Sequence, residues 1–342
     1  MNKNYVVTFG EVLMRFSPSS HERIVQCNLF QSRFSGAEAN VAVSLAYLGD
    51  NVRFVSKFPD NVLGEAAEDS IRHFGVDTSF CLKGGERLGT YYTERGASQR
   101  ASMVLYDRKG SSFAMSSKQE YDWETFFKEC KWFHISGINL AISDNVYDIC
   151  LEACIIAKEM NVKICLDINY RSKLISKELL FDRVLRLLPY VDLLVGNESE
   201  IAMIAGRNIP LIELDDFDKY TEKCYQCAAA IQDKYGIKTV SASLRKLQSA
   251  SELSWSGLIL DEDVLHVSNR YDIKVIEVIG CGDAFVAGLL HSFMNEKSPM
   301  EALDFAVAAS CLKHTIEGDY NLVKEEEVGK LMSNYAYGIV QR

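Results

Sequence analysis

Short apolar runs alternate with longer amphipathic stretches along the chain, and this alternation is the main structural signal. Runs rich in Val, Ile and Phe predict strands, and stretches with apolar residues at helical spacing predict helices. The predicted strands lie at 5–9, 52–55, 132–135, 163–166, 193–195 and 239–242, and the predicted helices at 37–48, 62–74, 145–160 and 177–188. This order predicts an α/β fold with a mostly parallel central sheet and helices on both faces.

Two regions interrupt the alternation of strands and helices. About residues 12–35 and 76–108 show short strand patterns separated by turn residues such as Gly96. Such strands suit a small β-sheet lid over a cleft at the ends of the parallel strands. The chain has 5 prolines and shows no repeat or low-complexity linker, so we expect a single domain over 1–342.

The composition narrows the range of partners. The chain has 342 residues, of which 48% are hydrophobic, and this suffices to bury a large core. Lysine and arginine total 37 against 47 acidic residues, and the net charge of -10 disfavours nucleic acid and anionic membranes. No apolar run reaches the roughly 18 residues of a membrane span. We therefore expect a cytoplasmic protein that binds small molecules.

The 10 cysteines are scattered, and reduced thiols are the simplest interpretation. Cys150 and Cys154 lie on one face of a predicted helix, where small apolar side chains pack. Cys224 and Cys227 form a CxxC pair, but they fall within a predicted helix and lack a second pair or a histidine at zinc-ligand spacing. Packing is predicted for them, not metal binding.

The turn from Gly280 to Asp283 is the strongest candidate for chemistry. A strand-like pattern at 273–278 precedes it, and an apolar, helix-compatible stretch follows at 284–293. The glycines let the backbone approach a ligand closely, and the first N–H groups of a helix favour negative charge. A phosphate is expected there. The turn alone leaves open whether Asp283 is a general base or a helix cap.

This turn is the last of six motifs that follow one another along the chain in a characteristic order. They are Gly10 to Phe16, Ser35 to Ala42, Pro59 to Asn61 with Gly64, Gly75 to Asp77, Asn197 to Glu200, and Gly280 to Asp283. With these motifs the chain resembles the ribokinase-like, or phosphofructokinase-B, carbohydrate kinases, and among them the 2-keto-3-deoxygluconate kinases. The resemblance covers about residues 5–330.

The resemblance implies a ribokinase-like fold and ATP-dependent phosphorylation of a sugar hydroxyl. Phosphoryl transfer depends mainly on positioning and on relief of negative charge. Asp283 would accept the hydroxyl proton, as a general base does. The main-chain N–H groups around Gly280, Cys281 and Gly282 would hold the transferred phosphate.

The resemblance also implies Mg²⁺, which keeps much of its hydration shell in proteins. Asn197 and Glu200 would organise the ion through water. The same residues fit a helix N-cap followed by a glutamate at the third helical position, and both roles can hold at once. Ser243 and Arg245 would lie near the nucleotide phosphates. Whether a monovalent cation assists is left open.

Substrate recognition depends on arginines and tyrosines. A keto-deoxy acid carries a carboxylate that neutral sugars lack, and a planar guanidinium suits it. Arg108 and Arg171 are predicted to bind this group. Glu38 matches a capping box with Ser35 and is given no role in the site. The other sugar contacts that the resemblance implies are Gly36, Asn40, Tyr91, Tyr106 and Asp319.

Three interpretations of the function remain. The first is a kinase for the terminal hydroxyl of 2-keto-3-deoxygluconate, and the second is a kinase for fructose, ribose or a nucleoside on the same fold. The third is a catalytically silent sensor, which the intact Asp283 disfavours. Ser35, Glu277 and Ile175 depart from the family pattern, so the reaction is better determined than the substrate. Pairing of two copies through the lid is also left open.

Overall fold

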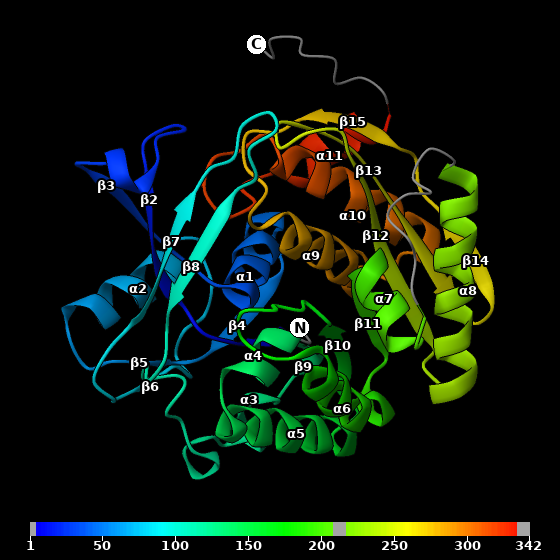
Figure 1. Ribbon diagram of the computed structural model, residues 1–342. Coiled ribbons are helices and arrows are strands. Elements are labelled where there is room, and N and C mark those ends of the chain that lie inside the picture. The colour runs from blue at the N-terminus through cyan, green and yellow to red at the C-terminus, as the bar shows by residue number, and fades with distance from the viewer. Residues whose placement is uncertain (1–4, 208–216, 334–342) are drawn as a thin grey trace.

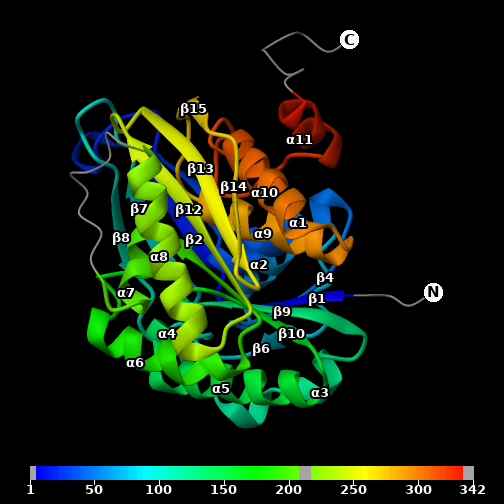
Figure 2. The same ribbon diagram turned by 90° about the vertical axis from the view of Figure 1, so that its right-hand side faces the viewer.

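A computed structural model of the chain describes residues 5–207 and 217–333 (Figures 1 and 2). Its central sheet has the order β14-β13-β12-β11-β10-β9-β1-β4, with β15 paired to β13. The strands from β12 to β4 are parallel, and β13, β14 and β15 are antiparallel. The bounds are β1 Tyr5–Phe9, β4 Asn51–Val55, β9 Cys130–Ser136, β10 Lys163–Asp167, β11 Leu193–Asn197, β12 Thr239–Leu247, β13 Glu252–Asp261, β14 Val264–Val267 and β15 Tyr271–Lys274.

Helices cover both faces of this sheet, as the sequence predicts (Figure 2). Val6 and Val7 of β1 belong to different core clusters, because successive strand residues face opposite sides. One face packs against α1 Ala37–Leu48, α2 Val62–Arg72, α9 Cys281–Met294 and α10 Pro299–Lys313, on which α11 Glu325–Met332 lies. The other packs against α3 Trp123–Phe126, α4 Gly137–Ile142, α5 Asp144–Glu159, α6 Lys177–Leu187, α7 Glu198–Ile204 and α8 Phe217–Tyr235.

A second sheet stands apart from the first (Figure 1). Its order is β3-β2-β7-β8, and we call it the lid sheet. Its strands are β2 Leu13–Pro18, β3 Phe30–Ser35, β7 Gly89–Glu94 and β8 Met103–Asp107. These strands lie in the two regions that interrupt the predicted alternation of strands and helices. The first part of the second region stays outside the lid sheet, because β6 Leu82–Lys83 pairs with β5 Lys57–Phe58.

Two local predictions differ from the structure. The strand before the glycine turn ends at Lys274, because the Glu277 carboxylate accepts the N–H groups of Val278 and Ile279 and so forms a turn. Glu277 is buried, whereas Val278 is 41% exposed. Gly36, not Ser35, is the N-cap of α1, and no side chain caps it. The capping box predicted for Ser35 is therefore absent.

The cysteine prediction is consistent with the structure. All ten thiols are free, and Cys224 and Cys227 are buried within α8. Burial raises the pKa of both. Among the described residues, no group of three or more His, Cys, Asp or Glu side chains is placed to hold a metal ion, and no helix is long and apolar enough to cross a membrane.

Candidate active site

A cavity of about 710 Å³ opens where the lid sheet faces the C-terminal ends of the parallel strands. Tyr91 and Tyr106 line it from the lid sheet, and Asp167 and Asn197 line it from the last residues of β10 and β11. Open parallel sheets bind ligands at this edge. Every residue that the sequence predicts for the site lines this cavity, with the exception of Asp319.

The glycine turn forms one wall of the cavity and leads into α9. Gly280 is the N-cap in the left-handed conformation, with φ 84°, and a β-carbon there would lie 2.0 Å from the carbonyl oxygen of Asp319. Only glycine fits both demands. A β-carbon on Gly282 would meet nothing within 4 Å, so space is open above it. We call residues 280–283 the anion cradle, because the first N–H groups of α9 have no intrahelical acceptor.

Asp283 lies in the first turn of α9 and is buried at the cavity wall. Burial raises the pKa of Asp283 to about 6, although the hydrogen bond from Asn40 and the charge of Arg171 lower it. The Asn40 amide donates to the carboxylate at 2.6 Å. A carboxylate with this pKa is largely ionised at neutral pH and can accept a proton from a hydroxyl.

The two predicted arginines differ in their partners. Arg108 is buried and donates from Nε to Glu11 at 2.8 Å, so an internal carboxylate already occupies its guanidinium. Arg171 is exposed at the cavity, and its guanidinium donates to the carbonyl of Tyr170 at 3.4 Å. No acid pairs with Arg171 in the part of the chain that the structure describes. Arg171 is therefore an open cation for an anionic ligand.

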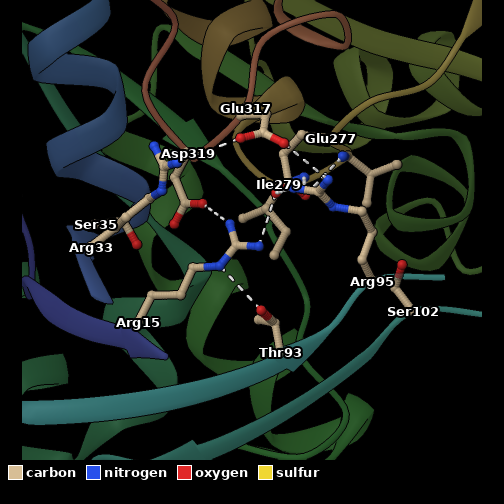
Figure 3. A network of polar contacts seen from close by, with 12 residues as sticks. Arg15, Arg33, Ser35, Thr93, Arg95, Ser102, Glu277, Ile279, Glu317 and Asp319 are labelled. Carbon is tan, nitrogen blue, oxygen red and sulfur yellow. Dashed lines mark hydrogen bonds and ion pairs between the residues drawn. The ribbon is translucent and has the colours of Figure 1, made fainter. Parts of the chain in front are cut away.

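Asp319 lies behind the cavity wall, in a different place from the one expected. Its carboxylate accepts a hydrogen bond from Arg15 (Figure 3) and another from the Tyr91 hydroxyl. The Ser35 hydroxyl lies 2.5 Å from the same Tyr91 oxygen. Asp319 thus orients Tyr91, which lines the cavity in its place. These partners are far apart in sequence, so the sequence offered no signal for the network.

Asn197 and Glu200 form the predicted helix start. Asn197 caps α7 and accepts the N–H groups of Ser199 and Glu200 at 3.0 Å each. The two carboxylate oxygens of Glu200 accept the N–H groups of Tyr170 at 2.7 Å and Asn197 at 2.8 Å. Both carboxylate oxygens therefore already have backbone partners, so Glu200 would contact a nearby ion through a water molecule.

Asp167 is a site residue that the sequence interpretation missed. It ends β10, lines the cavity and accepts a hydrogen bond from Asn169 at 2.9 Å. Burial and the nearby charge of Glu200 raise the pKa of Asp167. The buried carboxylates of Asp167 and Glu200 repel each other, and a divalent cation that lies between this pair and a bound phosphate would relieve the repulsion. The residues present therefore fit Mg²⁺. The sequence signal that could have identified Asp167 is an acidic residue at the end of a buried strand.

Glu38 is the second missed residue. It lines the cavity, is fully buried and accepts a hydrogen bond from Ser136. Burial raises the pKa of Glu38 to about 7, and Asp283 adds to the effect. The sequence signature of a capping box concealed this position.

The far end of the cavity combines polar and apolar side chains. Ser243 lies beside Asn197 in the β11–β12 register, and Arg245 follows on the same strand with an exposed side chain. Leu247 and Val286 also line the cavity. A flat ring with attached phosphates suits this combination.

Comparison with known proteins identifies relatives over nearly the whole chain. Residues 3–326 match the family described as pfkB family carbohydrate kinase. The 2-dehydro-3-deoxygalactonokinase of Haloferax volcanii is 30% identical over 334 residues, which are 98% of this chain and 98% of that protein. The 5-dehydro-2-deoxygluconokinase of Clostridium perfringens is 26% identical and covers 90% of this chain and 86% of its own.

A solved structure agrees with the sequence comparison. The 2-dehydro-3-deoxygluconokinase of Thermotoga maritima is 38% identical and superposes with a TM-score of 0.91, covering 96% of this chain and 98% of its own. The overall fold of this chain, over nearly its whole length, is thus shared with a solved protein of related sequence.

Proposed function

Because the chain belongs to the pfkB family of carbohydrate kinases, we propose that this sugar kinase phosphorylates the terminal hydroxyl of 2-keto-3-deoxygluconate with ATP. The observation that supports the substrate is Arg171, whose guanidinium faces the same cavity as Asp283 and has no acidic partner among the described residues. A sugar acid can place its carboxylate on this cation while its other end reaches the base.

The reaction is an in-line displacement. Asp283 takes the proton of the sugar hydroxyl, whose oxygen forms a bond to the terminal phosphorus as the bond from that phosphorus to the bridging oxygen of ADP breaks. The N–H groups of the anion cradle stabilise the charge on the moving phosphoryl group, and one such donor is typically worth roughly 3 to 4 kcal/mol. A positioned base adds about 10²- to 10⁴-fold in rate.

The nucleotide occupies the side of the cavity formed by Ser243 and Arg245. Arg245 neutralises phosphate charge, and the apolar surface beside it accepts the base. When bound, Mg²⁺ neutralises the charge of the phosphates. Asp167 and Glu200 would hold the ion, in part through water. Asn197 caps α7 and so fixes the position of Glu200.

The sugar occupies the side formed by the lid sheet. Tyr91, Tyr106, Gly36 and Asn40 line this part and contact its hydroxyls. Arg108 orients Tyr106 and the adjoining lid strand through its pair with Glu11, and Arg171 binds the carboxylate.

The similarity to the Haloferax protein favours a second candidate substrate, the galactonate epimer of the same keto-deoxy acid. A coupled ADP-release assay with both epimers, 5-dehydro-2-deoxygluconate, fructose and ribose tests the proposal. The highest kcat/KM is expected for 2-keto-3-deoxygluconate. Turnover of fructose or ribose without turnover of either keto-deoxy acid would refute it, and binding of all sugars without turnover would favour a sensor.

A further inference from the structure

Three arginines extend from the lid sheet to the loops behind the anion cradle (Figure 3). Two of them lie in lid strands and the third directly follows a lid strand, and their partners are three acids of two loops in the body of the protein. The arginines are Arg15 of β2, Arg33 of β3 and Arg95, which directly follows the last residue of β7, and the acids are Glu277, Glu317 and Asp319. The lid sheet is thereby joined to the cradle side of the cavity by charge.

Arg15 is the buried centre of this network, with an exposed fraction of 3%. Its Nη2 donates to Glu277 at 2.8 Å, its Nη1 donates to Asp319, and its Nε donates to the Thr93 hydroxyl at 3.1 Å. Burial lowers the pKa of Arg15, but the charges of Asp319 and Glu277 outweigh this effect and raise it. Each guanidinium nitrogen thus has a partner, two of them in the body and one in the lid.

The outer pairs of the network are longer and more exposed. Arg95 lies 3.2 Å from Glu317 and 3.8 Å from Glu277, and Arg33 lies 3.7 Å from Glu317. Solvent and salt screen pairs of this kind. They surround the Arg15 contacts but contribute less to the position of the two loops.

The first acid, Glu277, shapes the turn into the cradle. While one oxygen of its carboxylate binds Arg15, the other accepts the N–H groups of Val278 at 3.1 Å and Ile279 at 3.2 Å. Its carbonyl also accepts the Cys281 thiol at 3.4 Å. The position of this side chain therefore sets the path of the backbone that leads to the cradle.

The second acid, Asp319, supports the cradle from behind. Its carbonyl oxygen is so close to Gly280 that a β-carbon there would lie 2.0 Å from it. Its carboxylate binds Arg15 and the hydroxyl of Tyr91, which lines the sugar side of the cavity. One arginine of the lid therefore holds a loop before the cradle, a loop behind it and, through Asp319, a side chain at the sugar.

We propose that Arg15 is a positioning residue that holds the anion cradle in shape from the lid sheet, so that the phosphate side and the sugar side of the cavity are assembled together. The proposal rests on the proposed function, because the cradle is where the transferred phosphate is assigned. Transfer requires the reacting groups to be aligned to within a fraction of an ångström, and a misplacement of 1 Å costs about 10²-fold in rate. ADP lacks the transferred phosphate, so its affinity is independent of Arg15.

The test compares Arg15→Met with Arg87→Met, a control arginine that lies two residues before β7 and forms its ion pair, within the described part of the chain, with Asp107 of β8. We expect Arg15→Met to lower kcat for the sugar acid about 10²-fold, with ADP affinity by calorimetry unchanged, and Arg87→Met to leave both unchanged. Arg15→Lys should recover only part of the rate, because one ammonium lacks the fork that reaches both acids. A folded Arg15→Met enzyme with the kcat of Arg87→Met would overturn the proposal.

Two further measurements keep the test decisive. Arg95→Met removes a partly exposed arginine and leaves Arg15 in place, so it tests the network even where Arg15→Met does not fold, and a smaller loss of kcat is expected. Amide hydrogen exchange of residues 278–283 needs no turnover and should be faster in Arg15→Met or Arg95→Met than in Arg87→Met. Equal exchange in all three refutes the positioning role, whereas altered exchange in an enzyme that phosphorylates no sugar refutes only the proposed function.

Discussion

Replacing Asn40 by leucine tests the base and its environment together. The amide of Asn40 donates to Asp283 at 2.6 Å and stabilises the ionised carboxylate, against the burial that raises the pKa of Asp283 to about 6. A hydrogen bond to a charged group contributes roughly 1.5 to 3 kcal/mol, and each 1.36 kcal/mol corresponds to one pH unit. Its loss should therefore raise the midpoint of the acid limb by roughly 1 to 2 pH units.

The assay is kcat/KM for the sugar acid between about pH 5 and 9, compared with Asn145→Leu on the exposed first turn of α5 as a control. At pH 6 the loss of ionised base should by itself lower the Asn40→Leu rate roughly 5- to 50-fold, and near pH 9 only the pH-independent loss of the sugar contact should remain. A loss of equal size at every pH would refute the reasoning, because Asn40 would then act only as a sugar contact.

Four other substitutions separate catalysis, carboxylate binding and stability from one another. Asp283→Asn should abolish most turnover yet raise the unfolding free energy at pH 7 by roughly 2 to 3 kcal/mol. Folding raises the pKa of Asp283 from 3.8 to about 6, so its carboxyl contributes its full stability below pH 3.8 and loses it as the pH rises through 6. The uncharged asparagine avoids this loss at pH 7. Thermal melts that show no gain would contradict this. Arg171→Met should lower kcat/KM for the sugar acid about 10- to 100-fold with little effect on fructose, which parallel assays with both sugars measure; an equal loss for both would remove Arg171 from carboxylate binding. Gly280→Ala should lower both stability and turnover, because its β-carbon meets the backbone of Asp319, whereas Gly282→Ala should lower turnover alone. Denaturant unfolding distinguishes the two, and equal stability would show that the cradle backbone adapts.

Pairing of two copies through the lid sheet stays a prediction. The outward side of that sheet carries partly or fully exposed apolar side chains such as Phe16, Tyr92 and Leu105. Light scattering on the purified protein would measure the oligomeric state directly.

The sequence by itself determined the elements and the cradle. Apolar periodicity is a local property, so the strands of the parallel sheet and helices such as α1 could be predicted close to their observed bounds. Gly280, Gly282 and Asp283 are nearly consecutive, and the geometry of a helix start follows from a few residues. The predicted site residues then converge because the C-terminal ends of parallel strands share one edge of the sheet.

Tertiary structure alone decided which charges are available to a ligand. Arg108 and Arg171 look alike in the sequence, but the fold pairs Arg108 with Glu11, 97 positions away, and leaves Arg171 facing the cavity. Arg15 and Asp319 meet across 304 positions. A capping signature likewise cannot reveal that Glu38 turns toward Ser136. Contacts between distant segments depend on how the layers pack, and no local pattern of residues encodes that packing.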